Sequence, residues 1–235
     1  MDKRVAIVTG GTSGIGRATA LALRENGYTV YELSRRAEGM PGIPHIVADI
    51  TKEETLRSAV AQVLAAEGRI DLVVNNAGFG ISGAIEFTDT QEAQRLFDTL
   101  FFGMVRMNRC VIPLMRQQGH GRIVNISSVA APVPIPFQAY YSAGKAAINA
   151  YTMALANELR PFGVTVCAVM PGKRPSPATR STAGASAAPS RAWSTTSRPA
   201  WTPPRWAATS PPWPAGRAVI TPCMPPASTT SSLSS

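Results

Sequence analysis

The sequence has few cysteines, no apolar run long enough to cross a bilayer, and no acidic residue after position 172. Its 3 cysteines, Cys110, Cys167 and Cys223, stand singly. An odd number without metal-ligand spacing argues against a disulfide framework and a zinc site, and favours a reducing compartment. No run approaches 18 apolar residues, and the N-terminus lacks the apolar core and cleavage site of a signal peptide. We therefore expect a soluble, cytoplasmic protein with no bound metal and no membrane partner.

The absence of acidic residues after position 172 divides the chain into two parts. Residues 1–172 contain 16 Lys and Arg against 14 Asp and Glu, whereas residues 173–235 contain 7 basic residues, so most of the net charge of +9 belongs to the second part. That part has 12 Pro, 12 Ser and 12 Ala, but only one Leu, one Ile and one Val. Such a segment cannot bury enough apolar surface to offset its chain entropy. We therefore expect residues 173–235 to form a disordered tail. Interleaved Arg and Trp residues are found in nucleic-acid-binding arms, but we expect no nucleic-acid partner for this tail.

Residues 1–172 alternate short apolar runs with segments of helical periodicity. The apolar runs predict strands at 4–9, 29–33, 45–48, 70–74, 122–126 and 164–169. The periodic segments predict helices at 15–27, 51–68, 88–117 and 138–160. The capping box Thr51-x-x-Glu54 opens the second helix, and Thr88-x-x-Gln91 begins the third. Strands that are apolar on both faces and alternate with helices indicate one α/β domain, with a doubly wound parallel sheet.

A glycine-rich segment follows the first predicted strand and opens the first predicted helix. Its spacing is Gly10-x-x-x-Gly14-x-Gly16. In this context, backbone N–H groups and the helix dipole receive a pyrophosphate, so the segment predicts a dinucleotide site. The residues that we expect to contribute are Gly10, Thr12, Ser13, Gly14, Ile15 and Gly16.

Three motifs follow one another along the chain, and together they resemble the short-chain dehydrogenase/reductase family over residues 4–172. They are Thr9-Gly10-x-x-x-Gly14-x-Gly16, Asn75-Asn76-Ala77-Gly78 and Tyr141-x-x-x-Lys145. The resemblance implies a Rossmann-like fold and hydride transfer between a nicotinamide cofactor and a small-molecule carbonyl or alcohol substrate. The segment from Gly78 to Glu86 is similar to that of reductases acting on apolar or lipid-like substrates.

Tyr141 and Lys145 lie four residues apart and therefore share one face of the predicted helix. A tyrosine hydroxyl, whose ordinary pKa is about 10, is a poor acid–base group at neutral pH, but a nearby ammonium group lowers the cost of forming the phenolate. We expect Tyr141 to exchange a proton with the substrate oxygen, Lys145 to assist it and hold the nicotinamide ribose, and Ser128 to hydrogen-bond the substrate oxygen. Tyr140 is a rival acid, but its neighbour at i+4 is Gly144, which has no side chain.

The end of the second predicted strand favours NADP(H), with NAD(H) as the alternative. NAD-preferring members of the family carry an acidic residue there, which accepts a hydrogen bond from the ribose 2′-hydroxyl. This chain has Ser34 followed by Arg35 and Arg36. A hydroxyl and a guanidinium can bind a 2′-phosphate that a carboxylate would repel. Matches to further cofactor-binding positions of the family are Asp49, Ile50, Asn76, Ala77, Gly78, Pro171 and Gly172.

The chain departs from the family pattern in two places. Leu100 stands where the family has an asparagine, whose main chain supports a water beside the catalytic lysine. After Gly172, the family's cofactor loop, substrate-covering helices and final strand are not recognisable. These departures predict impaired turnover, and they leave a catalytically defective dinucleotide-binding module as the alternative function.

The missing family elements also bear on assembly and on the origin of the tail. Without a final strand, the strand at 164–169 is expected to become an exposed apolar edge, which argues against the homo-oligomer usual for the family. A GC-rich gene read out of frame yields an excess of Ala, Pro, Arg, Ser and Thr, as residues 173–235 have. We therefore hypothesise that a frameshift near codon 173 replaced the native C-terminus.

Overall fold

The computed structural model describes residues 4–172, and the predicted disordered tail at 173–235 lies outside this range. Within these residues, six parallel strands form one sheet in the order β3-β2-β1-β4-β5-β6. This is the strand order of doubly wound dinucleotide-binding sheets, so the predicted fold class is confirmed. The strands are β1 (Arg4–Thr9), β2 (Tyr28–Ser34), β3 (His45–Val47), β4 (Leu72–Asn75), β5 (Gly121–Ile126) and β6 (Val164–Val169).

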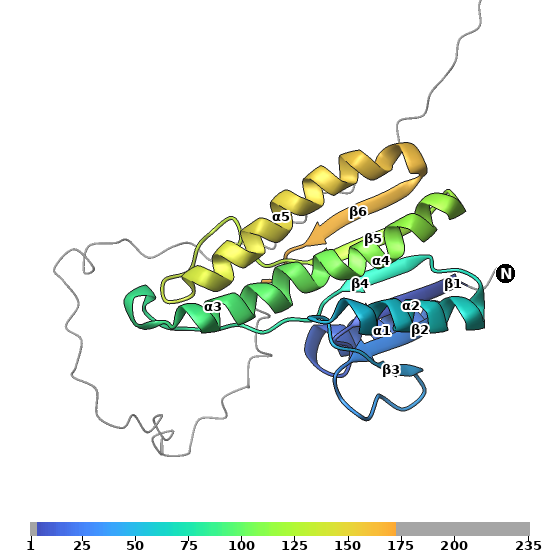
Figure 1. Cartoon of the computed structure of the whole chain (residues 1–235), viewed down its shortest axis with the longest axis horizontal. Helices are drawn as coiled ribbons and strands as arrows, with labels where there is room; N and C mark the ends of the chain where they lie inside the picture. The colour runs from blue at the N-terminus through green and yellow to red at the C-terminus, as the bar shows by residue number, and fades with distance from the viewer. Residues whose placement is uncertain (1–3, 173–235) are drawn as a thin grey trace, which may run out of the picture. The chain divides into compact units, whose positions relative to one another are not determined.

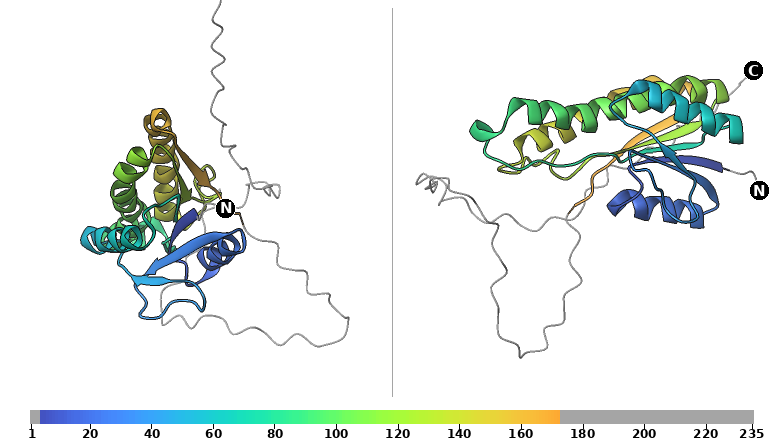
Figure 2. Two further views of the ribbon diagram at one scale, coloured as in Figure 1. Left: turned by 90° about the vertical axis from the view of Figure 1, so that its right-hand side faces the viewer. Right: turned by 60° about the horizontal axis from the view of Figure 1, so that its bottom comes forward.

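Helices cover both faces of the sheet. In Figures 1 and 2, α1 lies on one face, and α2, α4 and α5 lie on the other. The helices are α1 (Gly14–Glu25), α2 (Glu53–Glu67), α3 (Thr90–Phe97), α4 (Gly103–Gln118) and α5 (Ala139–Leu159), with short helical turns η1 (Ile85–Phe87), η2 (Asp98–Phe102) and η3 (Arg160–Phe162).

Alternate residues of the strands pack into two separate hydrophobic cores, one on each face of the sheet. Ile7 and Ile123 are fully buried against α2 and α4, where Val63 and Met107 meet them. Val8, on the opposite face of β1, packs in the core that contains Ala20 of α1. Since each fully buried aliphatic side chain contributes about 1.5–3 kcal/mol, these two cores hold the sheet and the loops at its ends in place.

The β5–β6 end of the sheet is less well covered on the face where α1 lies. Val124 and Ile126 are only partly buried there, and Val169 is 42% exposed. β6 is the outermost strand within residues 4–172, and no helix of these residues covers this part of the face. β6 is thus the edge strand of the described sheet, and the exposed apolar edge expected at 164–169 stays a prediction, because residues 173–235 lie outside the described range.

The predicted capping box of α2 is wrong. α2 begins at Glu53, with Lys52 at the N-cap and no side-chain cap. Thr51 is held elsewhere, because its N–H and hydroxyl donate to Asp49 Oδ1 at 3.0 and 2.8 Å. This local Asx-type turn competes with the capping geometry that the sequence spacing suggested.

The predicted helix at 88–117 is three consecutive segments. Asp89, not Thr88, caps its start, because the Asp89 carboxylate accepts from Gln91 N at 2.8 Å. Between α3 and α4 the helix widens into the π-helical turn η2, which contains Leu100. Such turns are often found at functional sites.

Candidate active site

A cavity of about 650 Å³ opens at the carboxyl ends of β1, β2 and β4. β1 and β4 are neighbours at the point where the strand order reverses, which is where sheets of this kind bind ligands. Of the predicted cofactor-binding residues, the lining contains Gly10, Thr12, Ser13, Gly14, Ile15, Ser34, Arg35, Ile50, Asn76, Ala77 and Gly78. Within residues 4–172, the other predicted site residues lie outside this lining. They are Gly16, Asp49, Pro171, Gly172 and the three catalytic candidates Ser128, Tyr141 and Lys145.

The glycine-rich loop has a conformation that needs glycine. Gly10 and Gly14 have φ angles of 65° and 54°, in the left-handed region that L side chains avoid. A Cβ on Gly16 would overlap the Gly10 carbonyl and the Asn76 amide. The backbone of the loop is therefore packed so tightly against the end of β4 that no side chain would fit at Gly10 or Gly16.

Hydrogen bonds from the end of β4 hold this loop in place. Asn76 Nδ2 donates to Thr9 O at 3.1 Å and to Gly10 O at 3.0 Å. Thr9 Oγ1 accepts from the N–H groups of Asn76 and Ala77, both at 3.1 Å. Ser13, at the N-cap of α1, makes no side-chain cap hydrogen bond. The first amide groups of α1 are thus not satisfied by Ser13 and can receive an anion.

The side of the cavity formed by β2 carries positive charge. Ser34 ends β2, and the exposed residues Arg35 and Arg36 follow it in the lining. Nearby, burial raises the pKa of the Asp49 carboxyl, but hydrogen bonds from Thr51 and the charge of Arg35 outweigh burial and leave the pKa below its ordinary value. Asp49 therefore acts as an anion that braces the turn before α2, outside the cavity lining.

Tyr141 and Lys145 share a face of α5, as the spacing predicted. Lys145 Nζ lies 5.6 Å from the centre of the Tyr141 ring. The lysine is 5% exposed, and its Nζ donates to Ile126 O at 2.6 Å. Burial lowers the pKa of this ammonium group from 10.5 to about 8. A buried lysine with a pKa this low is typical of a functional position.

Ser128 lies in the loop after β5, close to the segment that follows β6. It is buried, and its Oγ accepts from Ala130 N at 3.1 Å. The loop is tied to α5 because Ser127 Oγ donates to Lys145 O at 3.1 Å. Val129 N donates to Pro171 O at 3.3 Å, so Pro171 lies beside this loop. α5, the loop after β5 and the end of β6 therefore meet at one place.

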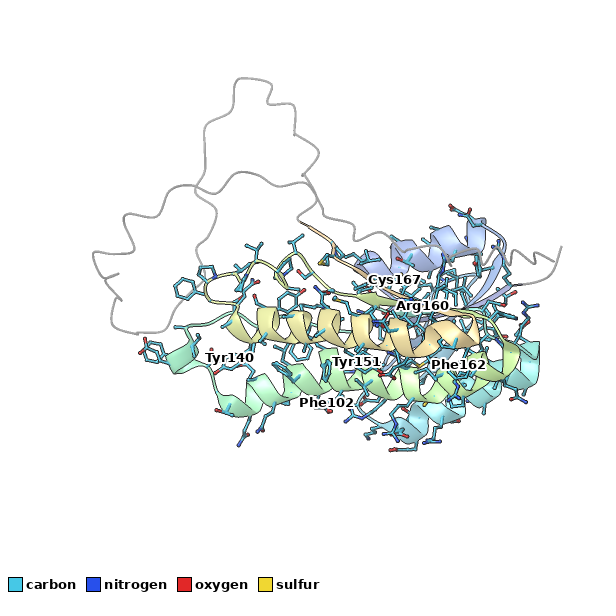
Figure 3. The ribbon with its side chains drawn as sticks, turned by 90° about the horizontal axis from the view of Figure 1, so that it is seen from above. Phe102, Tyr140, Tyr151, Arg160, Phe162 and Cys167 are labelled. Atoms are coloured by element: carbon cyan, nitrogen blue, oxygen red, sulfur yellow. The ribbon has the colours of Figure 1, made fainter. Side chains whose placement is uncertain are left out.

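The two adjacent tyrosines of α5 face different surroundings. A Cβ on Gly80 would lie 3.6 Å from Tyr141 Cδ2, so the Tyr141 ring borders the segment that follows β4 and lines the cavity. Tyr140 instead lines a groove with Phe97 and Phe102. Figure 3 shows Tyr140 near the start of α5, with Phe102 on the neighbouring helix. This arrangement favours Tyr141 over Tyr140 as the acid.

Leu100 fills an apolar space between the segment after β4 and α5. It is 2% exposed. A Cβ on Gly78 would overlap Leu100 Cδ2, and a Cβ on Gly144 would lie 3.6 Å from Leu100 Cδ1. The position where the family has a polar asparagine is thus packed with hydrocarbon in this chain.

Sequence reasoning missed two buried polar groups beside the site. Behind the end of β4, Asn75 Nδ2 donates to Asn108 Oδ1 at 2.7 Å and to Asn125 Oδ1 at 2.9 Å. Under the glycine-rich loop, Glu32 of β2 is fully buried and bonds to His45. Asn75 belongs to a motif quoted from the sequence, but its contacts with Asn108 and Asn125 could not be predicted from it. For Glu32, the signal in the sequence was a carboxylate inside a predicted strand.

Residues 4–172 hold neither a metal-binding cluster nor a membrane-spanning helix. Residues 4–172 contain no group of three His, Cys, Asp or Glu side chains arranged to hold a metal ion. No helix of these residues is long and apolar enough to cross a membrane.

Comparison with known proteins gives consistent matches. A family model of the short chain dehydrogenases matches residues 4–185. A 3-ketodihydrosphingosine reductase of Bacteroides thetaiotaomicron is 42% identical over 173 residues, which are 73% of this chain and 64% of the relative. The NADPH-dependent 1-acyldihydroxyacetone phosphate reductase of Schizosaccharomyces pombe is 34% identical over 178 residues, which are 73% of this chain and 60% of the relative.

A solved structure has the same fold. The crystal structure of a short-chain dehydrogenase from Streptomyces avermitilis gives a TM-score of 0.71 at 39% identity, and the match covers 74% of this chain and 66% of that one. The chain spans less than two thirds of the length of the two reductases.

Proposed function

The chain belongs to the short-chain dehydrogenase/reductase family, and we propose that it is an NADP(H)-dependent oxidoreductase that interconverts a carbonyl and an alcohol. The observation that carries this proposal is the placement of Tyr141 and Lys145 on one face of α5, with Tyr141 against Gly80 in the segment that leaves the cavity. That cavity lies at the switch point of the sheet and has a volume within the range of about 300–1,000 Å³ typical of ligand sites.

The residues around the cavity fit a dinucleotide. The left-handed glycines, the crowded Gly16 and the start of α1 form a backbone cradle suited to a pyrophosphate. Arg35 and Ser34 would hold a 2′-phosphate, and the residues after β4 would line the path toward Tyr141. When bound, the nicotinamide supplies the hydride in reduction and accepts it in oxidation.

The catalytic roles follow from the surroundings of each side chain. The Tyr141 hydroxyl gives a proton to the substrate oxygen in reduction and takes it back in oxidation. The Lys145 ammonium favours the tyrosinate by its charge, and since Ile126 O occupies one of its three N–H donors, two remain for ribose hydroxyls. Ser128 donates a hydrogen bond to the substrate oxygen and orients it.

We propose a ketone with a long apolar chain as the substrate class. Large exposed apolar side chains lie in the segment after β4 (Ile85 and Phe87) and in the segment before α5 (Val133 and Ile135). The hydrogen bond from Gly83 N to Phe137 O, at 2.8 Å, joins these two segments beside Tyr141. Two of the relatives are named for lipid ketones, a ketodihydrosphingosine and an acyldihydroxyacetone phosphate.

A second candidate function is dinucleotide binding without turnover. Leu100 supports it, because this apolar side chain packs against Gly78 and Gly144 at the position where the family has an asparagine, whose main chain supports a water beside the catalytic lysine.

Steady-state oxidation of NADPH, with long-chain and short-chain ketones, tests the proposal. We expect turnover that favours the long-chain ketones and that Tyr141→Phe abolishes, with NADPH affinity retained within a few fold. Tyr140→Phe is the matched control and should keep its activity, because Tyr140 faces the α3 groove. Tight NADPH binding with no reduction of any ketone would select the binding module, and activity retained in Tyr141→Phe would refute the assignment of the acid.

A further inference from the structure

Glu32 is a carboxylate inside the sheet, and no lysine or arginine is its partner among the ion pairs of residues 4–172. It stands on β2 between β1 and β3, and it is fully buried. Its Oε1 accepts from Gly11 N at 2.9 Å, and its Oε2 accepts from Ser34 Oγ at 3.4 Å and bonds to His45 Nδ1. Since a buried carboxylate without partners is strongly destabilising, these contacts are what allow Glu32 to stay there.

His45 continues the chain of hydrogen bonds toward the loop after β2. It stands at the start of β3, directly opposite Glu32 in the strand register. Its Nε2 lies 2.9 Å from Arg36 O, and because a carbonyl only accepts, this nitrogen carries a proton. Its Nδ1 bonds to the Glu32 carboxylate. The imidazole therefore links the buried carboxylate to the backbone of the loop after β2.

The two residues join the parts of the site that recognise different phosphates. At one end, Glu32 holds Gly11 of the glycine-rich loop, so closely that a Cβ on Gly11 would lie 2.5 Å from Glu32 Cγ. At the other end, His45 holds the backbone of Arg36, next to Arg35 in the cavity lining. A Cβ on Gly39 would overlap the His45 Cβ, which shows that the loop after β2 wraps closely around this ring.

We propose that Glu32 and His45 are positioning residues that set the preference for NADP(H), by holding the loop that carries Arg35 in the conformation that receives a 2′-phosphate. The proposal rests on the proposed cofactor. Arg35 is exposed, and in a free loop it would have to be ordered each time it binds the phosphate. With the Glu32–His45 pair in place, the backbone of this loop is already ordered before binding. NADH has no 2′-phosphate, so the ordered loop does not increase its affinity.

The test measures the dissociation constants of NADPH and NADH by nicotinamide fluorescence, so it does not depend on turnover. In His45→Phe and Glu32→Leu we expect the NADPH-to-NADH preference to fall on the order of tenfold, as when one charge-assisted contact is lost. Glu32→Gln should keep the preference within about twofold. In that variant the amide N–H can donate to His45 Nδ1, while Oε1 still accepts from Gly11 N.

Controls separate positioning from a general loss of stability. Tyr31→Phe removes a different side-chain bond of β2, the 2.8 Å bond to Glu67, and should leave the preference unchanged. His45 is partly exposed, so His45→Phe provides the test even if the fully buried Glu32→Leu does not fold. The positioning role would be overturned if His45→Phe weakened the binding of NADPH and NADH equally. It would also be overturned if Tyr31→Phe lowered the NADPH-to-NADH preference as much as His45→Phe does. A wild-type protein that does not prefer NADPH would instead refute the proposed cofactor.

Discussion

Replacing Lys145 with methionine should make the protein more stable at neutral pH while it removes a catalytic group. The pKa of about 8, against 10.5 for an unburied lysine, means that keeping the ammonium form in the folded protein at pH 7 costs about 3 kcal/mol. Lys145→Met removes this cost. It also loses the hydrogen bond from Nζ to Ile126 O, which stabilises by about 1–2 kcal/mol. We expect Lys145→Met to raise the free energy of unfolding at pH 7 by about 1–2 kcal/mol.

The pH dependence of this difference follows from the sign of the pKa shift. Below pH 8, Lys145 is protonated in both states and the full cost is present. Between pH 8 and 10.5, the unfolded state binds more protons than the folded state, so wild-type stability rises with pH relative to the variant. Above 10.5 the cost is gone and only the hydrogen bond remains. The variant should therefore change from more stable to less stable than wild type across this interval.

Urea unfolding, followed by circular dichroism from pH 7 to pH 10.5, measures this difference. Lys52→Met is the matched control, because Lys52 is exposed and its replacement should give a difference from wild type that does not vary over this range. A Lys145→Met protein that is less stable than wild type at pH 7, by an amount that stays constant up to pH 10.5, would refute the reasoning.

Three further predictions concern the cofactor and the packing around Leu100. Arg35→Ala should weaken NADPH binding by about 1.5–3 kcal/mol and leave NADH binding unchanged, as measured by fluorescence titration; equal weakening of both would make Arg35 structural. Leu100→Asn should raise kcat for ketone reduction, because it returns the asparagine of the family to the position between Gly78 and Gly144, and an unchanged kcat would show that Leu100 does not limit turnover. Gly78→Ala should destabilise the fold by about 1–3 kcal/mol, because its Cβ overlaps Leu100 Cδ2. Leu100→Ala should recover part of that loss in a double-mutant cycle, whereas strictly additive effects would contradict the contact.

The parts of the fold that depend on local pattern could be predicted from the sequence. The run Val5-Ala6-Ile7-Val8 is apolar on both faces, as a central parallel strand must be, and β1 is found there. The spacing of Tyr141 and Lys145 fixed their shared face on α5. The capping of α2 was predicted wrongly because Asp49 competes for Thr51, and local spacing alone does not resolve such competition.

The parts that depend on contacts between distant residues could not be predicted. The bond between Glu32 and His45 exists because β2 and β3 pair in a particular register, which a single sequence does not reveal. The different surroundings of Tyr140 and Tyr141 likewise arise only when α5 packs beside α3 and η2. The sequence spacing favoured Tyr141 as the acid, and the groove around Tyr140 adds a physical reason to propose it.

The most direct test of the account is deuterium transfer from NADPH, labelled on the transferring position, to a long-chain ketone in a single turnover with enzyme in excess. Excess enzyme makes even slow chemistry visible. We predict deuterium on the carbinol carbon of the alcohol with wild type and with Tyr140→Phe, and none with Tyr141→Phe. No transfer by wild-type protein saturated with NADPH, or equal transfer by Tyr141→Phe, would contradict the central claim that Tyr141 and Lys145 form the active site of a reductase.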